Sequence, residues 1–177
     1  MREKPCLLVL DTNVWIEANL GWRKGHKEAN ELIAFARNHA IELAYAITTV
    51  KDVYYLVGAD LKWKERKEKG ELSEEDAEII SEIAWAVTNN MSEVATPVGM
   101  DMADVWMARK LRSIHNDLED NLVIAAGERA GADYIVTSDS KLLANPHVRA
   151  MTAADMLKHL QVFEAFYPES NCNKCLR

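Results

Sequence analysis

The chain has 177 residues, of which 49% are hydrophobic and 28% are charged, so it is suited to one globular domain rather than to a disordered chain. Its formal net charge of −7 at pH 7 excludes binding to nucleic acid through a broad cationic surface, but it does not exclude a nuclease with acidic metal ligands. We expect a single domain over residues 1–162 and a C-terminal tail over residues 163–177.

The first half of the chain alternates strands with helices. A continuous apolar run over residues 6–10 is typical of a buried parallel strand and is too short for a membrane span or a signal core. Helical spacing follows from about residue 28 to residue 39, and residues 42–47 form the second predicted strand. Thr48 and Thr49 then offer hydroxyl groups that could cap the next helix.

Two long helices are expected in the middle of the chain. The helix that follows the threonines continues into the charged residues 62–69 and ends at Gly70. Ser73 begins the other helix, whose first turn carries acidic residues where the helix dipole favours them. The buried stripe of this helix is predicted to consist of Ile79, Ile80, Ile83, Ala84 and Val87.

The second half of the chain continues the alternation. We expect strands over residues 94–98, 134–137 and 147–151, and helices over residues 101–113, 117–130 and 153–161. Strands separated by helices imply right-handed crossover connections. The sequence therefore predicts an α/β fold, a three-layer α/β/α sandwich around a mostly parallel central sheet of four or five strands.

Acidic residues stand just after the predicted strands or at the start of the next helix. These residues are Asp11, Asp52, Asp117, Glu119, Asp120 and Asp139. Ligands of parallel α/β sheets bind at the carboxyl ends of the strands, so one crevice could collect these carboxylates. Their mutual repulsion would be relieved by Mg²⁺ or Mn²⁺, which prefer oxygen ligands and can activate a water molecule that attacks a phosphate.

Four segments repeat the order and spacing of motifs that are known from one protein family. They are Leu7–Val14, Thr48–Leu56, Asp117–Asp120, and Gly131–Thr137 with Asp139. Together they resemble the acidic motifs of PIN domains, the ribonuclease family that includes the VapC-like toxins. The resemblance covers roughly residues 6–160 and implies a PIN-like version of the three-layer fold.

The resemblance also implies roles for individual residues. Asp11, Asp52, Asp120 and Asp139 would form the catalytic, metal-binding quartet, with Asp117 and Glu119 as further candidates beside the metal. Asn13 would orient Asp11, and Thr137 or Ser138 would hold the site through hydroxyl hydrogen bonds. The family commonly has Glu where this chain has Asp52. In the third motif, spacing leaves open which of Asp117, Glu119 and Asp120 faces the cation.

The function implied by the resemblance is metal-dependent hydrolysis of RNA phosphodiester bonds, often by the toxin of a type II toxin–antitoxin pair. Such toxins bind a small antitoxin protein, and many are homodimers. The alternative is a PIN-fold module that binds RNA or a protein with little or no turnover. A nucleotide-binding domain is disfavoured because the turn Asp11–Asn13 has no glycine-rich phosphate cradle.

Other conspicuous residues have simpler interpretations. Clusters of lysine and arginine along the chain could guide an RNA strand, with Trp22 and Trp63 as stacking partners for its bases. The simpler interpretation of these clusters is a solvated surface. Trp85 and Trp106 suit a core or a dimer surface. We assign no chemistry to the five scattered histidines, which are His26, His39, His115, His147 and His159.

The three cysteines cannot form a fully paired disulfide framework, so we expect reduced thiols and a cytoplasmic protein with no membrane partner. Cys172 and Cys175 resemble half of a zinc site, but the sequence offers no second half with suitable spacing. We interpret both as ordinary thiols of the tail.

Overall fold

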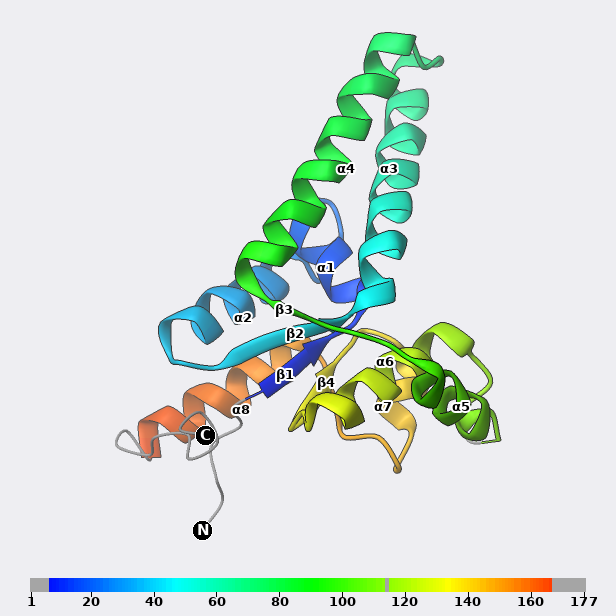
Figure 1. Ribbon diagram of the computed structural model, residues 1–177. Helices are drawn as coiled ribbons and strands as arrows, with labels where there is room; N and C mark the ends of the chain where they lie inside the picture. The colour runs from blue at the N-terminus through cyan, green and yellow to red at the C-terminus, as the bar shows by residue number, and fades with distance from the viewer. Residues whose placement is uncertain (1–6, 114, 167–177) are drawn as a thin grey trace.

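The computed structural model describes residues 7–113 and 115–166, which form a five-stranded sheet covered by helices (Figure 1). The order of the strands is β3-β2-β1-β4-β5, and every neighbouring pair is parallel. The strands are β1 (Leu7–Leu10), β2 (Glu42–Ala46), β3 (Thr96–Val98), β4 (Tyr134–Val136) and β5 (Ala150–Met151). The predicted α/β class and parallel sheet are confirmed.

Helices connect the strands. They are α1 (Thr12–Asn19), α2 (His26–Asn38), α3 (Ile47–Lys69), α4 (Glu74–Val94), α5 (Met102–Leu111), α6 (Leu118–Ala130), α7 (Ser140–Ala144) and α8 (Ala153–Phe166). None of the described helices combines the length and the apolar character that a membrane span requires. Helix α8 continues beyond the predicted end at residue 161, while Cys6, Cys172 and Cys175 lie outside the described residues.

The sheet separates two apolar layers because successive side chains of a strand point to opposite faces. Leu8 and Leu10 of β1 pack in the layer that contains residues of α1, α2, α3, α4 and α8. Val9, between them, packs in the layer formed with α6 and α7, where Leu142 is fully buried. The predicted three-layer arrangement is thereby confirmed.

Helix α1 was not predicted from the sequence. It begins directly after Asp11, whose side chain accepts a hydrogen bond from the Thr12 backbone N–H at 2.7 Å and so caps the helix. Most of its residues are buried, including Trp15, which packs edge-on against Tyr45 with ring centroids 5.8 Å apart. A helix buried on most sides lacks the polar stripe by which amphipathic helices are recognised.

Helix α3 begins earlier than predicted, directly at the end of β2. Ala46 occupies the N-cap position and makes no side-chain capping bond. Thr48 and Thr49 lie inside the first turn, and their buried hydroxyl oxygens have no hydrogen-bond partner among the described residues. The predicted threonine cap is therefore wrong, because the strand passes into the helix without a turn. The predicted stop at Gly70 is confirmed by its left-handed backbone, with φ of 86°.

Helices α3 and α4 form a hairpin that projects from the sheet (Figure 1). The predicted Ser73 cap is confirmed, since Ser73 Oγ accepts a hydrogen bond from the Asp76 backbone N–H at 3.0 Å. Ile80 is buried as expected, but Ile79 is 52% exposed and Ile83 is 40% exposed. The stripe is narrower than predicted because the projecting part of α4 has only α3 to pack against.

Two tryptophans that the sequence assigned to a core or a dimer surface are exposed. Trp85 on α4 and Trp106 on α5 are 56% and 57% exposed. The core interpretation is therefore wrong for both, and the dimer surface stays a prediction.

The strand order creates a crevice between β1 and β4. From β1 the chain passes to β2 and β3 on one side and returns to β4 on the other side. Ligands of parallel sheets bind at such a switch in direction. The two strand ends are joined where the Asp11 backbone N–H donates to the Val136 carbonyl oxygen at 2.9 Å. The loops that leave these strands, which carry Asp11 and Asp139, therefore start side by side.

Candidate metal centre

Asp11 is the most buried carboxylate of the crevice, with 2% exposure. Its Oδ1 accepts a hydrogen bond from the Thr12 backbone N–H, and its Oδ2 accepts one from Thr137 Oγ1, each at 2.7 Å. The pKa of Asp11 is raised to about 6, chiefly by burial and in addition by the negative charges of Asp120 and Glu119, although the hydrogen bonds from Thr137 and Thr12 act in the opposite direction. The surroundings of Asp11 therefore disfavour its charged form.

The start of α6 gives its three acidic residues different positions. Asp117 caps the helix by accepting hydrogen bonds from the backbone N–H groups of Glu119 at 2.9 Å and Asp120 at 3.4 Å. Glu119 accepts a hydrogen bond from Thr12 Oγ1 at 2.9 Å. Asp120 instead meets His115, whose Nε2 lies 2.6 Å from Asp120 Oδ2. Of the three, Asp120 therefore belongs to the group of side chains described next.

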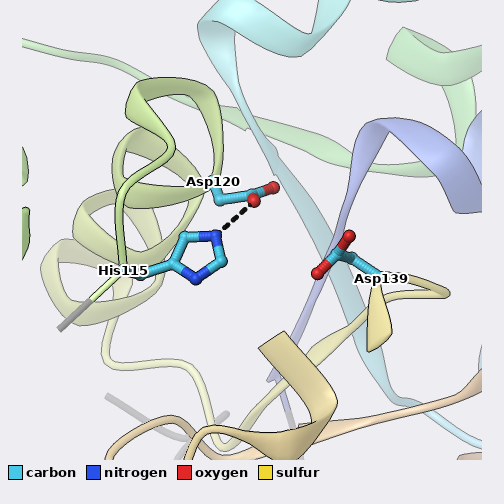
Figure 2. A group of neighbouring side chains, drawn as sticks. All are labelled: His115, Asp120 and Asp139. Carbon is cyan, nitrogen blue, oxygen red and sulfur yellow. Dashed lines mark hydrogen bonds and ion pairs between the residues drawn. The ribbon is translucent and has the colours of Figure 1, made fainter. Parts of the chain in front are cut away.

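His115, Asp120 and Asp139 form a compact cluster of candidate metal ligands (Figure 2). Each offers one ligand atom, and these atoms all lie within 4.8 Å of one another. Asp139 caps α7 through its Oδ1, which accepts hydrogen bonds from the backbone N–H groups of Lys141 at 2.8 Å and Leu142 at 2.9 Å. Asp139 is therefore held as the N-cap of α7, while Asp120 lies in the first turn of α6.

Burial and neighbouring negative charges raise the pKa of Asp120. Burial makes the largest contribution, and the charges of Asp117 and Asp139 add to it, while the hydrogen bond from His115 acts in the opposite direction. The pKa of Glu119 is also raised, first by burial and then by the charges of its acidic neighbours. Perturbed carboxyl groups gathered in one crevice are typical of functional sites.

Asp52 lies outside the cluster of His115, Asp120 and Asp139. On α3 it forms an ion pair with Lys51, with 3.1 Å between Lys51 Nζ and Asp52 Oδ1. Its charge raises the pKa of Glu119, which places it beside that residue. Among the described residues, the compact cluster contains Asp120 and Asp139 but not Asp52.

The residues that were predicted to support the site differ in their burial and in their hydrogen bonds to the acidic residues. Thr137 is fully buried and links the two loops, since its hydroxyl donates to Asp11 and accepts from the Asp139 backbone N–H at 2.9 Å. Asn13 and Ser138 are both exposed. Asp11 accepts hydrogen bonds from the Thr12 backbone N–H and from Thr137 Oγ1. The orienting role of Asn13 and the supporting role of Ser138 stay predictions.

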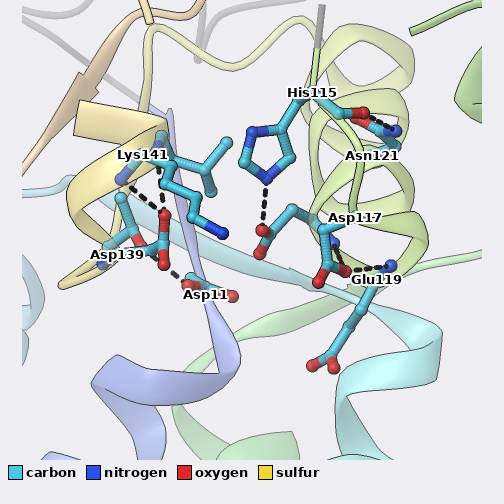
Figure 3. A network of polar contacts seen from close by, with 10 residues as sticks. Asp11, His115, Asp117, Glu119, Asn121, Asp139 and Lys141 are labelled. Carbon is cyan, nitrogen blue, oxygen red and sulfur yellow. Dashed lines mark hydrogen bonds and ion pairs between the residues drawn. The ribbon is translucent and has the colours of Figure 1, made fainter. Parts of the chain in front are cut away.

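A groove of about 640 Å³ opens beside the cluster. Its walls include Asp117, Lys141 and His147 together with the three clustered residues. Figure 3 shows Lys141 extending its side chain from α7 toward His115. The groove therefore offers acidic groups that can bind a cation and an ammonium group that can bind an anion in the same space.

His115 is the site residue that the sequence analysis missed. It lies in the loop between α5 and α6 and is only 7% exposed. Nothing in the spacing of the histidines singles it out, because its partners are a carboxylate five residues later and another after β4. The one available signal was its place just before the third acidic motif.

The residues fit a divalent cation. Carboxylate oxygens are the donors that Mg²⁺ and Mn²⁺ prefer, and an imidazole nitrogen is compatible with first-row transition ions. The raised pKa values of Asp11, Glu119 and Asp120 indicate negative charge that the protein itself leaves uncompensated. A cation supplies that compensation.

A family model described as PIN domain matches residues 7–141, and the chain therefore belongs to the PIN-domain family. PIN domains are a family of metal-dependent nucleases. No curated protein matches the chain.

Two solved structures are similar in fold. One is VapBC2 from Rickettsia felis bound to a DNA fragment from its promoter, with a TM-score of 0.56 and 14% identity, covering 82% of this chain and 98% of that chain. The other is Mycobacterium tuberculosis VapC20, a toxin that cleaves the sarcin–ricin loop, with a TM-score of 0.56 and 14% identity. It covers 78% of this chain and 95% of that chain. At this identity the likeness shows a shared fold alone.

Proposed function

We propose that the chain is a divalent-metal-dependent endoribonuclease that hydrolyses RNA phosphodiester bonds. The observation that carries the proposal is the cluster of Asp120 and Asp139 with His115, and a buried Asp11 near enough to Asp120 for their charges to interact, in a member of the PIN-domain family. Carboxylates in such an arrangement suit a cation that binds phosphate oxygens.

The proposed roles follow from the position of each residue. Asp120 and Asp139 hold the cation together with Asp11, which Thr137 and Thr12 keep in place. The bound cation would supply an activated water molecule and charge stabilisation at the phosphate. Lys141 lines the same groove and binds a phosphate oxygen of the substrate.

Purified protein tests this function directly. With Mg²⁺ or Mn²⁺ it should cleave RNA internally, and EDTA should stop the cleavage. Asp11→Asn, purified in the same way, should leave the RNA intact, which separates the activity of this chain from a contaminating nuclease. Equal cleavage by both proteins would contradict the proposal. RNA binding without cleavage at any metal concentration would favour the alternative of a PIN-fold binding module.

We propose further that the chain acts as the toxin of a toxin–antitoxin pair and binds a small antitoxin protein. The fold shared with VapC20 and with VapBC2 supports this role. The exposed apolar residues Tyr55, Ile79 and Trp85 of the α3–α4 hairpin support a protein partner, a second copy of the chain included. Expression of the chain in a bacterial host should arrest growth, and Asp11→Asn should not. Sedimentation of the purified protein reports whether it is a homodimer.

A further inference from the structure

A histidine side chain faces the two carboxylates of the proposed metal site. His115 Nε2 lies 2.6 Å from Asp120 Oδ2, and Asp139 approaches from the start of α7 on the other side (Figure 2). His115 and Asp120 lie five residues apart at the start of α6, whereas the fold brings Asp139 to them from the loop after β4. The arrangement is that of an N/O donor set rather than of a purely acidic site.

The loop that carries His115 is held on both sides. The His115 backbone N–H donates to the Leu111 carbonyl oxygen at 2.8 Å, and the His115 carbonyl oxygen accepts a hydrogen bond from Asn121 Nδ2 at 2.8 Å. Asn121 is itself 2% exposed on the first turn of α6. The backbone of His115 is thus anchored to α5 and to the helix that carries Asp120, which limits the positions that the imidazole can take.

The size of the cluster suits a single cation. Two ligand atoms on opposite sides of a Mg²⁺-sized ion lie about 4.2 Å apart, at about 2.1 Å from the ion. The three candidate atoms lie within 4.8 Å of one another, so small side-chain rotations bring them to bonding distance. On binding, the cation would take the place of the hydrogen bond between His115 and Asp120.

We propose that His115 is a nitrogen ligand of the cation that Asp120 and Asp139 hold, and that it directs the site toward Mn²⁺ and related first-row ions in preference to Mg²⁺. The inference rests on the proposed function, because it names the donor set of that same site. Mn²⁺ shares the preference of Mg²⁺ for oxygen ligands but accepts an imidazole nitrogen more readily, as the later first-row ions do to a greater degree. A site with one imidazole therefore distinguishes between the two classes of cation.

The competing explanation is that His115 only orients Asp120 through their hydrogen bond. His115→Gln separates the two roles, since the glutamine amide keeps an N–H donor but cannot replace the imidazole nitrogen as a ligand. His115→Asn serves as a second variant of this kind. His147→Gln is the matched control, because His147 lines the same groove but lies outside the cluster.

Pulsed electron paramagnetic resonance of the Mn²⁺-loaded protein detects a directly bound imidazole through its ¹⁴N coupling. We expect the coupling in the parent protein and in His147→Gln, and its loss in His115→Gln and His115→Asn. Calorimetric titration should show a loss of Mn²⁺ affinity of roughly tenfold or more in the His115 variants, with a smaller change for Mg²⁺. Thermal unfolding in EDTA checks that each variant is folded.

Three results would overturn the inference. They are a parent spectrum without ¹⁴N coupling, a coupling that persists in both His115 variants, and a coupling that disappears in His147→Gln. RNA cleavage is measured separately on the same samples. A ¹⁴N-coupled ion without cleavage supports the ligand and contradicts the nuclease, whereas cleavage with an uncoupled ion supports the nuclease and contradicts the ligand.

Discussion

Thr137 Oγ1 donates a hydrogen bond of 2.7 Å to Asp11 Oδ2, and the two residues are the first to follow β4 and β1, respectively. The same oxygen accepts a hydrogen bond from the Asp139 backbone N–H. One buried hydroxyl thus connects two carboxylate-bearing loops that are more than a hundred residues apart in sequence. The position of both carboxylates depends on it.

Thr137→Val removes this hydroxyl at nearly unchanged volume. We expect the variant to lose about 1–3 kcal/mol of unfolding free energy, because the buried Asp11 carboxylate and the Asp139 N–H each lose a partner. Urea unfolding of the metal-free protein at neutral pH measures the loss. Thr137→Ser keeps the hydroxyl and should lose clearly less. Equal losses for the two variants would show that the methyl group, not the hydroxyl, matters.

The raised pKa of Asp11 predicts that the metal-free protein loses stability as the pH rises. The folded protein holds the Asp11 proton up to about pH 6, whereas the unfolded chain releases it near 3.8, so stability falls between these values and then stays level. A shift of this size corresponds to about 3 kcal/mol.

Asp11→Asn should therefore be more stable than the parent above pH 6 in EDTA and should show a weaker pH dependence. Some dependence should remain because the pKa values of Glu119 and Asp120 are raised as well. Thermal unfolding from pH 4 to pH 8 tests both points. Identical profiles for the parent and the variant would contradict the assignment of the raised pKa to Asp11.

The acidic residues should differ in their importance for cleavage. Asp120→Asn removes a member of the compact cluster, so we expect cleavage to fall well beyond a hundredfold. Asp52 pairs with Lys51 and lies outside the compact cluster, next to Glu119, so Asp52→Asn should cost about 10–100-fold, as the loss of an outer partner does. Single-turnover cleavage at saturating Mn²⁺ gives both rates. A greater loss for Asp52→Asn would place the cation nearer to α3.

Truncating two neighbouring isoleucines of α4 should change the free energy of unfolding by very different amounts. Ile80 is 6% exposed, so Ile80→Ala should cost about 2–5 kcal/mol of unfolding free energy. Ile79 is 52% exposed, so Ile79→Ala should change it by no more than about 0.5 kcal/mol. Denaturant unfolding at low protein concentration compares the two. A large cost for Ile79→Ala would indicate that this surface is covered in solution.

The sequence predicted those parts of the fold whose pattern is local. The apolar run of β1, the Ser73 cap and the Gly70 stop each depend on neighbouring residues, and all three occur. Helix α1 was missed because its burial on most sides comes from α2 and α3 rather than from its own sequence. Ile83 was assigned to the core because periodicity alone does not reveal that α4 projects beyond the sheet.

The candidate site shows the same limit. Asp11 and Asp139 could be selected because each follows a strand, which is a local property. The choice among the acids of α6 needed their contacts, since Asp117 caps the helix and only Asp120 meets His115. His115 was not selected, because the spacing of the histidines gives no sign of it and Asp139 becomes its neighbour only when the sheet has assembled.

The order of the strands has a consequence during synthesis on the ribosome. Strand β4 sits between β1 and the edge strand β5, yet the chain makes it only after β2, β3 and six of the helices. A nascent chain that ends before Thr137 lacks the hydroxyl that secures Asp11 and the Asp139 carboxylate of the cluster. Translation therefore has to deliver almost the whole domain before the pocket can be completed, so the carboxylates cannot gather on an unfinished polypeptide.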